Sequence, residues 1–329
     1  MAINEISTHE THSPAGRATQ WQLRTRTLLF EELPMLMGIV NVTPDSFSDG
    51  GQYYTRQSAV DHALRLEDAG AMIIDIGGES TRPYSQPVSE AEELERIVPI
   101  LESLQDRVAA AISIDTSKAS VAAAAIALGA EIINDVTGLE GDVRMLELAA
   151  HSGVGVCAMH MQGTPQTMQD HPSYGNIVEE IELYLAARDR ALLAGGIAPH
   201  RICLDPGIGF GKTHEHNWAL LRGCAHMHHL GRPLLVGHSR KGFVRKLTRP
   251  SIPAAPPSAS LSLSLPPSNV DVSTSAKANL RSTSAGDLVA GSVGVALALA
   301  RSGVQVLRVH DVQATRDALL CFAASGGLS

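Results

Sequence analysis

The hydrophobic pattern alternates between short apolar runs and longer segments in which apolar residues recur every three or four positions. The short runs are rich in Val, Ile and Leu, a composition and length typical of buried β-strands. They predict eight strands, at residues 36–42, 71–76, 111–114, 131–134, 154–159, 201–204, 233–236 and 304–309.

The segments between these runs have helical periodicity. One apolar stripe comprises Leu94, Ile97, Val98, Leu101 and Leu104, and a second comprises Ile177, Ile181, Tyr184 and Leu185. Near-continuous apolar strands separated by helices are typical of a parallel sheet covered on both faces. Eight evenly spaced units favour an α/β fold of the TIM (β/α)8 barrel class, with one domain over residues 21–329. An open, doubly wound sheet is the alternative.

Two stretches depart from this alternation. Residues 248–285 consist mostly of Pro, Ser, Ala, Leu and Asn, and such a segment buries too little apolar area to offset its ordering entropy. We expect a disordered, flexible insertion there, between two helices of the barrel. Residues 1–20 are predicted to form a disordered N-terminal tail.

Composition narrows the class of protein. The 329 residues carry a formal net charge of −8, which argues against a nucleic-acid partner because phosphate contacts need a basic face. Residues 1–26 lack the apolar core of a secretory signal, and no apolar run is long enough to span a membrane. The four cysteines form no CxxC pair, as expected of free, buried thiols. A cytoplasmic location is predicted.

Polar residues mark the carboxyl ends of the predicted strands, one set at each of the eight. In a TIM barrel the carboxyl ends of the strands surround the active site. Any one of these residues could simply cap the next helix, but eight successive cases favour a shared pocket. The residues are Asn41, Asp75 with Glu79, Asp115, Asn134 with Asp135, His160, Asp205, His238 with Ser239, and Arg308 with His310.

Two further motifs resemble a dinucleotide site and a metal site but are weak evidence for either. The run DPGIGFGK at residues 205–212 contains GxGxG, but it lies late in the chain and lacks the acidic ribose partner of a dinucleotide site. Its glycines are expected to let the backbone turn closely over a flat ligand. The second motif is a group of histidines whose spacing places no pair on one helical face, so surface residues are expected rather than metal ligands: His214, His216, His226, His228 and His229.

Several segments together resemble dihydropteroate synthases. MGIVNVTPDSFSDGG at residues 37–51 and GGESTRP at 77–83 are similar to long, specific signatures of that family. Shorter segments follow in the family's order: DTSK, IIND, MHMQGTPQTMQ, DPGIGFGK, GHSRK and RVHDV. The resemblance covers about residues 36–320, apart from the insertion. It implies a transferase of folate biosynthesis that condenses a dihydropterin diphosphate with p-aminobenzoate and releases pyrophosphate.

The resemblance also implies roles for individual residues. Pterin binding falls to Asp115, Asn134, Met159, Asp205, Phe210 and Lys241, and diphosphate binding to Asn41, Thr81, Arg308 and His310. Mg²⁺ is the expected cofactor, held by Asn41 together with substrate phosphate and water. The p-aminobenzoate site is assigned to Phe47, Arg82, Pro83 and Ser239, and the catalytic residues are Asp115, Lys241, Arg308 and His310.

Residue chemistry is consistent with these roles. A buried carboxylate such as Asp205 can accept two donors from the flat edge of a pterin. Arg308 and His310 stand two apart on a strand and therefore share a face, where they could clamp one anion. Ser239 lies at the expected start of a helix, where free NH groups favour a carboxylate. We further hypothesise that Asp115 stabilises a pterin cation, and that loops 43–52 and 78–89 close over substrate.

Some positions depart from the family pattern. Tyr84 stands where the family often has Gly, and His238 replaces a residue that is often Met, so both could alter sensitivity to the sulfonamides expected as inhibitors. Two other functions stay open: a pterin-dependent methyltransferase and a catalytically silent pterin-binding paralogue. The family resemblance implies a homodimer, on which the residues themselves give no information.

Overall fold

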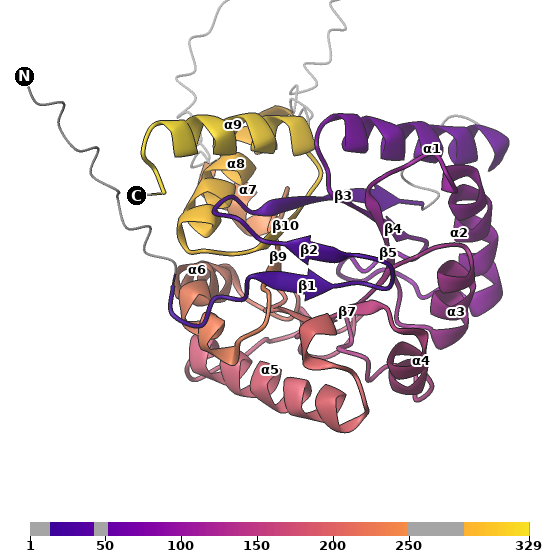
Figure 1. Ribbon diagram of the computed structural model, residues 1–329. Coiled ribbons are helices and arrows are strands. Elements are labelled where there is room, and N and C mark those ends of the chain that lie inside the picture. The colour runs from indigo at the N-terminus through magenta and orange to yellow at the C-terminus, as the bar shows by residue number, and fades with distance from the viewer. Residues whose placement is uncertain (1–13, 43–51, 249–285, 329) are drawn as a thin grey trace, which may run out of the picture.

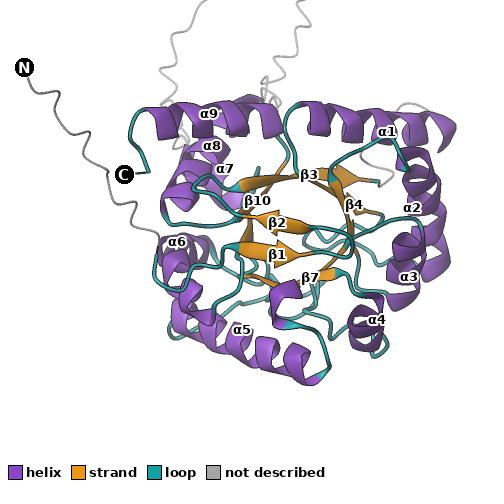
Figure 2. Cartoon of the chain, viewed as in Figure 1, coloured by secondary structure: helices purple, strands orange, loops and turns teal. Residues whose placement is uncertain are grey.

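The computed structural model describes residues 14–42, 52–248 and 286–328. Eight parallel strands form its centre, and helices surround them (Figures 1 and 2). All eight predicted strands are present, with bounds shifted by one or two residues. They are β3 (Met35–Asn41), β4 (Ile73–Gly77), β5 (Ala111–Asp115), β6 (Ile132–Asp135), β7 (Gly155–Met159), β8 (Ile202–Asp205), β9 (Leu235–Gly237) and β10 (Val306–Val309).

The sheet closes on itself. Its hydrogen-bonded order runs β8-β7-β6-β5-β4-β3-β10-β9, and a parallel bridge between Leu204 and Leu234 joins the two ends. The amide of Leu204 donates to the carbonyl of Pro233 at 2.9 Å, which completes the ring. The predicted TIM barrel is therefore confirmed, and the open doubly wound alternative is wrong.

Helices cover the outer face of the barrel, and three of those described begin at side-chain caps. Ser89, Asn176 and Thr213 accept hydrogen bonds from first-turn amides of α2, α5 and α6, which satisfies donors that the helix cannot pair itself. The helices are α1 (Gln52–Asp68), α2 (Glu90–Leu104), α3 (Ala119–Ala127), α4 (Met145–Ser152), α5 (Ile177–Ala194), α6 (His214–Gly223), α7 (Gly242–Thr248), α8 (Gly286–Arg301) and α9 (Val312–Ala324), with short 3₁₀ helices η2 (Pro199–Arg201) and η3 (Cys224–Leu230).

The two predicted apolar stripes lie against the sheet. On α2, Ile97, Leu101 and Leu104 are fully buried, and on α5 Ile181 and Leu185 are likewise buried. Burying one such side chain stabilises the fold by roughly 1.5–3 kcal/mol. None of the described helices is long and apolar enough to cross a membrane.

A second apolar cluster fills the barrel at the amino ends of its strands. Met37, Ile73 and Ile132 belong to this cluster. A short hairpin formed by β1 (Gln20–Gln22) and β2 (Thr27–Leu29) lies across this end of the barrel (Figure 2) and contributes Trp21 and Leu28 to the cluster. Side chains therefore fill the barrel at the amino ends of its strands.

The hairpin was not predicted, because strands of three residues are too short to produce a recognisable alternation. Trp21 on β1 is fully buried, and its indole NH donates to the carbonyl of Arg201 at 2.8 Å. Residues 14–20 of the predicted tail are also held, since Arg17 donates to the carbonyls of Gly303 at 2.9 Å and Glu31 at 2.7 Å. The rest of that segment, residues 1–13, lies outside the described residues.

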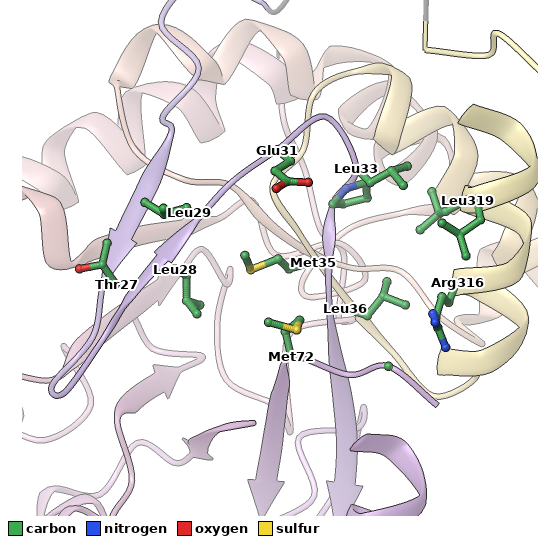
Figure 3. Close-up of a pocket in the computed structure, with 13 residues that line it drawn as sticks. Thr27, Leu28, Leu29, Glu31, Leu33, Met35, Leu36, Met72, Arg316 and Leu319 are labelled. Atoms are coloured by element: carbon green, nitrogen blue, oxygen red, sulfur yellow. The ribbon is translucent and has the colours of Figure 1, made fainter. Parts of the chain in front are cut away.

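An apolar groove of about 520 Å³ lies beside the hairpin. Figure 3 shows Leu28, Met35, Leu36 and Met72 around it, with Arg316 of α9 on one side. It is at the opposite end of the barrel from the polar strand ends. The predicted insertion falls between α7 and α8, as expected, but beyond Thr248 it lies outside the described residues up to Gly286.

Candidate active site

Strand pairing brings the polar residues of neighbouring strands to the same level of the barrel. Asp115 at the end of β5 is the register partner of Asn134 on β6, and Met159 on β7 is the partner of Asp205 on β8. All four side chains are buried. Residues that are far apart in the sequence therefore meet in one ring at the carboxyl ends.

The guanidinium of Arg308 forms the centre of this ring. Its Nε donates to Oδ2 of Asp75 and its Nη2 to Oδ2 of Asp115, each at 2.6 Å. The side-chain amide of Asn134 also donates to Oδ2 of Asp75, at 3.1 Å. Sequence reasoning had placed Asp75 at a strand end without giving it a role. The available signal was a carboxylate inside the otherwise apolar run IIDIG.

Two buried carboxylates share the single charge of Arg308. Burial raises the pKa of Asp115 to about 7, with Arg308 acting in the opposite direction and Asp75 adding to the rise. Burial disfavours the charged guanidinium, but the attraction of Asp75 and Asp115 outweighs it and raises the pKa of Arg308. The ring can thus hold one excess proton on a carboxyl group near neutral pH.

Asp205 and Lys241 lie on the other side of the ring. Oδ1 of Asp205 accepts from the amide of Gly207 at 2.7 Å, and burial raises the pKa of this carboxyl. The ammonium of Lys241 lies 4.6 Å from the centre of the Phe210 ring and donates to the carbonyl of Ile208. Burial lowers the pKa of Lys241 to about 7, although Asp205 opposes the change.

A cavity of about 970 Å³ opens above the ring. Most of the predicted site residues line it, which confirms that the sequence motifs converge on one place. Asn134, Met159 and Asp205 are buried and do not line the cavity, and Phe47 lies outside the described residues. The predicted residues that line it are Asn41, Thr81, Arg82, Pro83, Asp115, Phe210, Ser239, Lys241, Arg308 and His310.

One part of the cavity lining, here called the mouth, consists of groups that suit an anion. Arg82 and Arg240 line it together with Ser239 and His310. The Nδ1 atom of His310 lies 3.2 Å from the hydroxyl of Ser239, whose oxygen also accepts from the His310 amide at 3.3 Å. Burial, followed by the charges of Arg240 and Arg308, lowers the pKa of His310 to about 3. His310 is therefore a neutral hydrogen-bonding group at neutral pH.

The sequence predicted that Arg308 and His310 share a strand face and clamp one anion, and the structure agrees only in part. Both line the cavity, as their shared strand face predicted. However, two nitrogens of the Arg308 guanidinium are occupied by Asp75 and Asp115, so Arg308 faces the inner ring as well as the opening. The reason is tertiary: β10 lies next to β3 and near β4, which carries Asp75.

His238 points away from the cavity. It is fully buried, and its Nε2 lies 3.0 Å from the carbonyl of Ser292 on α8. The hydroxyl of the same serine accepts from the amide of Arg240 at 3.0 Å. A substitution of His238 could therefore affect a bound ligand only indirectly, by shifting the backbone of residues 238–241.

The five predicted surface histidines fall into three groups. His214 and His216 are half-buried, and His214 lines the cavity. His226 and His229 are exposed, as expected. The expectation is wrong for His228, which is fully buried with Nε2 2.9 Å from the carbonyl of Ser302, because η3 packs beneath the end of α8. Within the described part of the chain no cluster of three or more His, Cys, Asp or Glu side chains could hold a metal ion. Asn41, whose amide oxygen suits Mg²⁺, lines the cavity.

Comparison with known proteins agrees with this site. The model of a family described as pterin-binding enzymes matches residues 37–310, a span that contains every one of the polar strand ends. The chain belongs to the dihydropteroate synthase family of pterin-binding enzymes.

Its relatives in that family match over most of their length. The dihydropteroate synthase of Escherichia coli K12 is 41% identical over 286 residues, or 87% of this chain and 89% of that one. The enzyme of Neisseria meningitidis serogroup B is 43% identical, over 89% of this chain and 93% of the relative. The Xanthomonas albilineans dihydropteroate synthase with 4-aminobenzoic acid has a TM-score of 0.78 and 39% identity, over 94% of this chain and 98% of that one.

A further solved member of the family bears on inhibitors. The Yersinia pestis dihydropteroate synthase, whose structure contains a sulfonamide drug complex, matches with a TM-score of 0.77 and 40% identity over 93% of this chain and 99% of that one.

Proposed function

We propose that this chain condenses 6-hydroxymethyl-7,8-dihydropterin diphosphate with p-aminobenzoate at the 970 Å³ cavity, forming 7,8-dihydropteroate and pyrophosphate. The carrying observation is the set of residues that line that cavity. The buried carboxylate of Asp115 and the amine of Lys241 line it, and so do Arg82, Arg240 and Ser239. The first two suit a neutral heterocycle with donors and acceptors, and the other three suit anions.

The proposed pterin site comprises Asp115, Phe210 and Lys241, which line the cavity, together with Asn134, Met159 and Asp205, which are buried at the same strand ends. The carboxylate of Asp205 accepts the 2-amino group and ring NH, while Asn134 and Asp115 bind the remaining edge. Lys241 donates to the pterin carbonyl or ring nitrogen after leaving the carbonyl of Ile208. Phe210, which now lies under the Lys241 ammonium, forms one wall of the ring site and Met159 the other.

The diphosphate is assigned to Asn41, Thr81, Arg308 and His310, all of which line the same cavity. Asn41 fits a magnesium ion that takes one amide oxygen from the protein and its other ligands from phosphate and water. When bound, Mg²⁺ supplies positive charge that offsets the charge of the departing diphosphate. His310 as a neutral imidazole and Thr81 as a hydroxyl donate hydrogen bonds to the phosphate oxygens.

The chemical step places few demands on the protein. The bond between the pterin methylene carbon and the diphosphate oxygen breaks first, and its electron pair leaves with pyrophosphate. Asp115, near the ring, stabilises the resulting cation as a carboxylate. The amine nitrogen of p-aminobenzoate then forms the new C–N bond and loses a proton to solvent. Asp115→Asn with unchanged turnover and pterin affinity would contradict this role.

The p-aminobenzoate site is assigned to Arg82, Pro83 and Ser239 at the mouth, with Phe47 from the loop after β3. Arg82 and Ser239 offer charge and a hydroxyl to the carboxylate. We extend the sulfonamide binding of the Yersinia pestis relative to this chain, with the drug competing for the same place.

The decisive experiment mixes purified protein with the pterin diphosphate, p-aminobenzoate and Mg²⁺, and follows dihydropteroate and pyrophosphate. Product should require both substrates, fall on chelation of Mg²⁺, and disappear in Lys241→Ala. Lys246→Ala, which changes an exposed lysine of α7, is the matched control and should keep its activity. Pterin binding without product would favour the silent paralogue or the methyltransferase.

Two further properties are proposed on the family resemblance. A homodimer should sediment at twice the 34.8 kDa mass of the chain, and a single-chain mass would contradict it. A cytoplasmic location accords with four free cysteines, three of them buried. Recovery of the protein in a periplasmic or secreted fraction would contradict that location.

A further inference from the structure

Lys212 is a buried lysine beneath the turn that follows β8. Only 2% of it is exposed, and its Nζ donates to Nδ1 of His160 at 3.0 Å and to the carbonyl of Phe210 at 2.9 Å, while burial lowers its pKa well below the ordinary value. Burying an ammonium costs several kcal/mol unless its donors are satisfied. Such a group at the base of a ligand cavity calls for an explanation beyond packing.

The turn that Lys212 holds is shaped by glycines and pressed against the end of β7. Gly207, Gly209 and Gly211 all have φ between +62° and +87°, which L-residues with side chains rarely adopt. A Cβ on Gly207 would lie 1.8 Å from the carbonyl oxygen of His160. The turn therefore fits only in this position relative to His160.

Side chains from other elements fix the same turn from outside. Asn217 accepts from the amide of Gly209 at 2.6 Å, and Gln169 donates to the carbonyl of Gly209 at 2.9 Å. The hydroxyl of Tyr174 donates to the carbonyl of Gly211 at 2.8 Å. Lys212 supplies the inner support, since it binds the carbonyl of Phe210 from within.

The turn carries both proposed pterin contacts of this segment. Asp205 precedes it and is oriented by the amide of Gly207, and Phe210 is the residue whose carbonyl Lys212 binds. A shift of the turn would displace the carboxylate and the ring together. Precise placement of such groups depends on the residues behind them.

We propose that Lys212 and His160 form a positioning pair that holds the turn at residues 205–212, and thereby Asp205 and Phe210, in the geometry that binds the pterin. The pair acts through these two residues and is not itself catalytic. This inference rests on the proposed pterin site.

The state of His160 supports the pair. Burial, followed by the charge of Lys212, lowers the pKa of His160 to about 3, so the ring is neutral and Nδ1 can accept. The edge of Tyr184 packs against the His160 ring, with centroids 4.7 Å apart, and fixes its orientation. The acceptor is thus present and correctly aimed at neutral pH.

Lys212→Met keeps the apolar stem and removes the donors. The dissociation constant and KM for the pterin diphosphate should rise about tenfold, the loss expected when a buried acceptor is left without its hydrogen-bond donor. KM for p-aminobenzoate should stay within about twofold, because the mouth residues come from other segments. Lys246→Met on exposed α7 is the matched control and should change neither constant. A pterin affinity within about twofold of wild type would overturn the proposal.

A second pair of variants tests the acceptor. His160→Asn retains a side-chain oxygen near the place of Nδ1, whereas His160→Leu removes the acceptor. Asn should recover most of the pterin affinity that Leu loses, and equal losses would overturn the role of Nδ1. In Lys212→Met combined with His160→Leu, the losses should be less than additive because one contact is removed twice.

Binding by calorimetry separates this proposal from the proposed reaction. Wild-type protein that binds the pterin without product would contradict the reaction, and the affinity ratio of Lys212→Met to wild type would still decide the positioning role. Circular dichroism and Tm establish that each variant folds. If Lys212→Met does not fold, the comparison of His160→Asn with His160→Leu decides the question.

Discussion

Arg308 on the last barrel strand is bonded to Asp75 on the second, with 2.6 Å between Nε and Oδ2. The same guanidinium reaches Asp115 on the third strand at the same distance. A single cation thus joins three strands across the open end of the barrel. Burial is the main cause of the raised pKa of Asp115, and the neighbouring charge of Asp75 adds to it while Arg308 opposes it.

Removing the guanidinium of Arg308 should lower the free energy of unfolding as well as the activity. Arg308→Met leaves two buried carboxylates without their partner, and the free energy of unfolding should fall by about 3–5 kcal/mol. Urea unfolding measures the loss. Arg144→Met breaks ion pairs to Glu90 and Asp142 at the surface and should lose only a small fraction as much. Equal losses in the two variants would contradict a buried role for Arg308.

The pH dependence of kcat/KM for the pterin diphosphate should be bell-shaped and centred near 7. Asp115 acts as a carboxylate, so activity should fall as the pH drops through its raised pKa of about 7. Lys241 acts as a donor, so activity should fall as the pH rises through its lowered pKa of about 7. Asp115→Asn should abolish the acidic limb only. A profile that is flat across neutral pH would show that neither group titrates there.

Stability should change with pH in two opposite steps. Between its ordinary pKa of 3.8 and about 7, Asp115 holds a proton in the folded state that the unfolded state has lost, so stability should fall as the pH rises. Between about 7 and 10.5, Lys241 is protonated only when unfolded, so its contribution should rise with pH. Urea unfolding at several pH values measures both slopes. Asp115→Asn should flatten the first, and an unchanged slope would refute the assignment.

Tyr84 provides a test of the loop that follows β4. Its φ of +64° is costly for a side chain of this size, whereas Gly would adopt it without strain. Its amide donates to the carbonyl of Pro165 at 2.9 Å, and its hydroxyl to Asp170 at 3.3 Å. Tyr84→Gly should keep the fold but change KM for p-aminobenzoate and sulfonamide inhibition together. A change in pterin KM alone would contradict the placement of Tyr84 at the mouth.

The matched control for that variant is Tyr84→Phe. It removes the hydroxyl and keeps the backbone and the ring, so it should resemble the wild type in Tm. A stabilisation by Gly of up to about 1 kcal/mol, absent in Phe, would assign the cost to backbone conformation rather than to the bond with Asp170.

Much of the architecture follows from local patterns. Each of the eight apolar runs is long enough to bury a strand, and the capped, periodic segments between them form helices because they bury one stripe against the sheet. The motif residues could be assigned to one end of the barrel because every strand of a parallel barrel points the same way. These features depend on short-range periodicity, which the sequence displays directly.

The sequence alone therefore determined the barrel, the open end and most of the residues around the cavity, from Asn41 to His310. Only the tertiary structure decided which charged side chains pair, because Asp75, Asp115 and Arg308 come from three strands that barrel formation brings together. It likewise revealed the buried pair of Lys212 and His160 and turned His238 away from the ligands. Such contacts join residues distant in sequence, and their distances and burial, rather than residue type, set their chemistry.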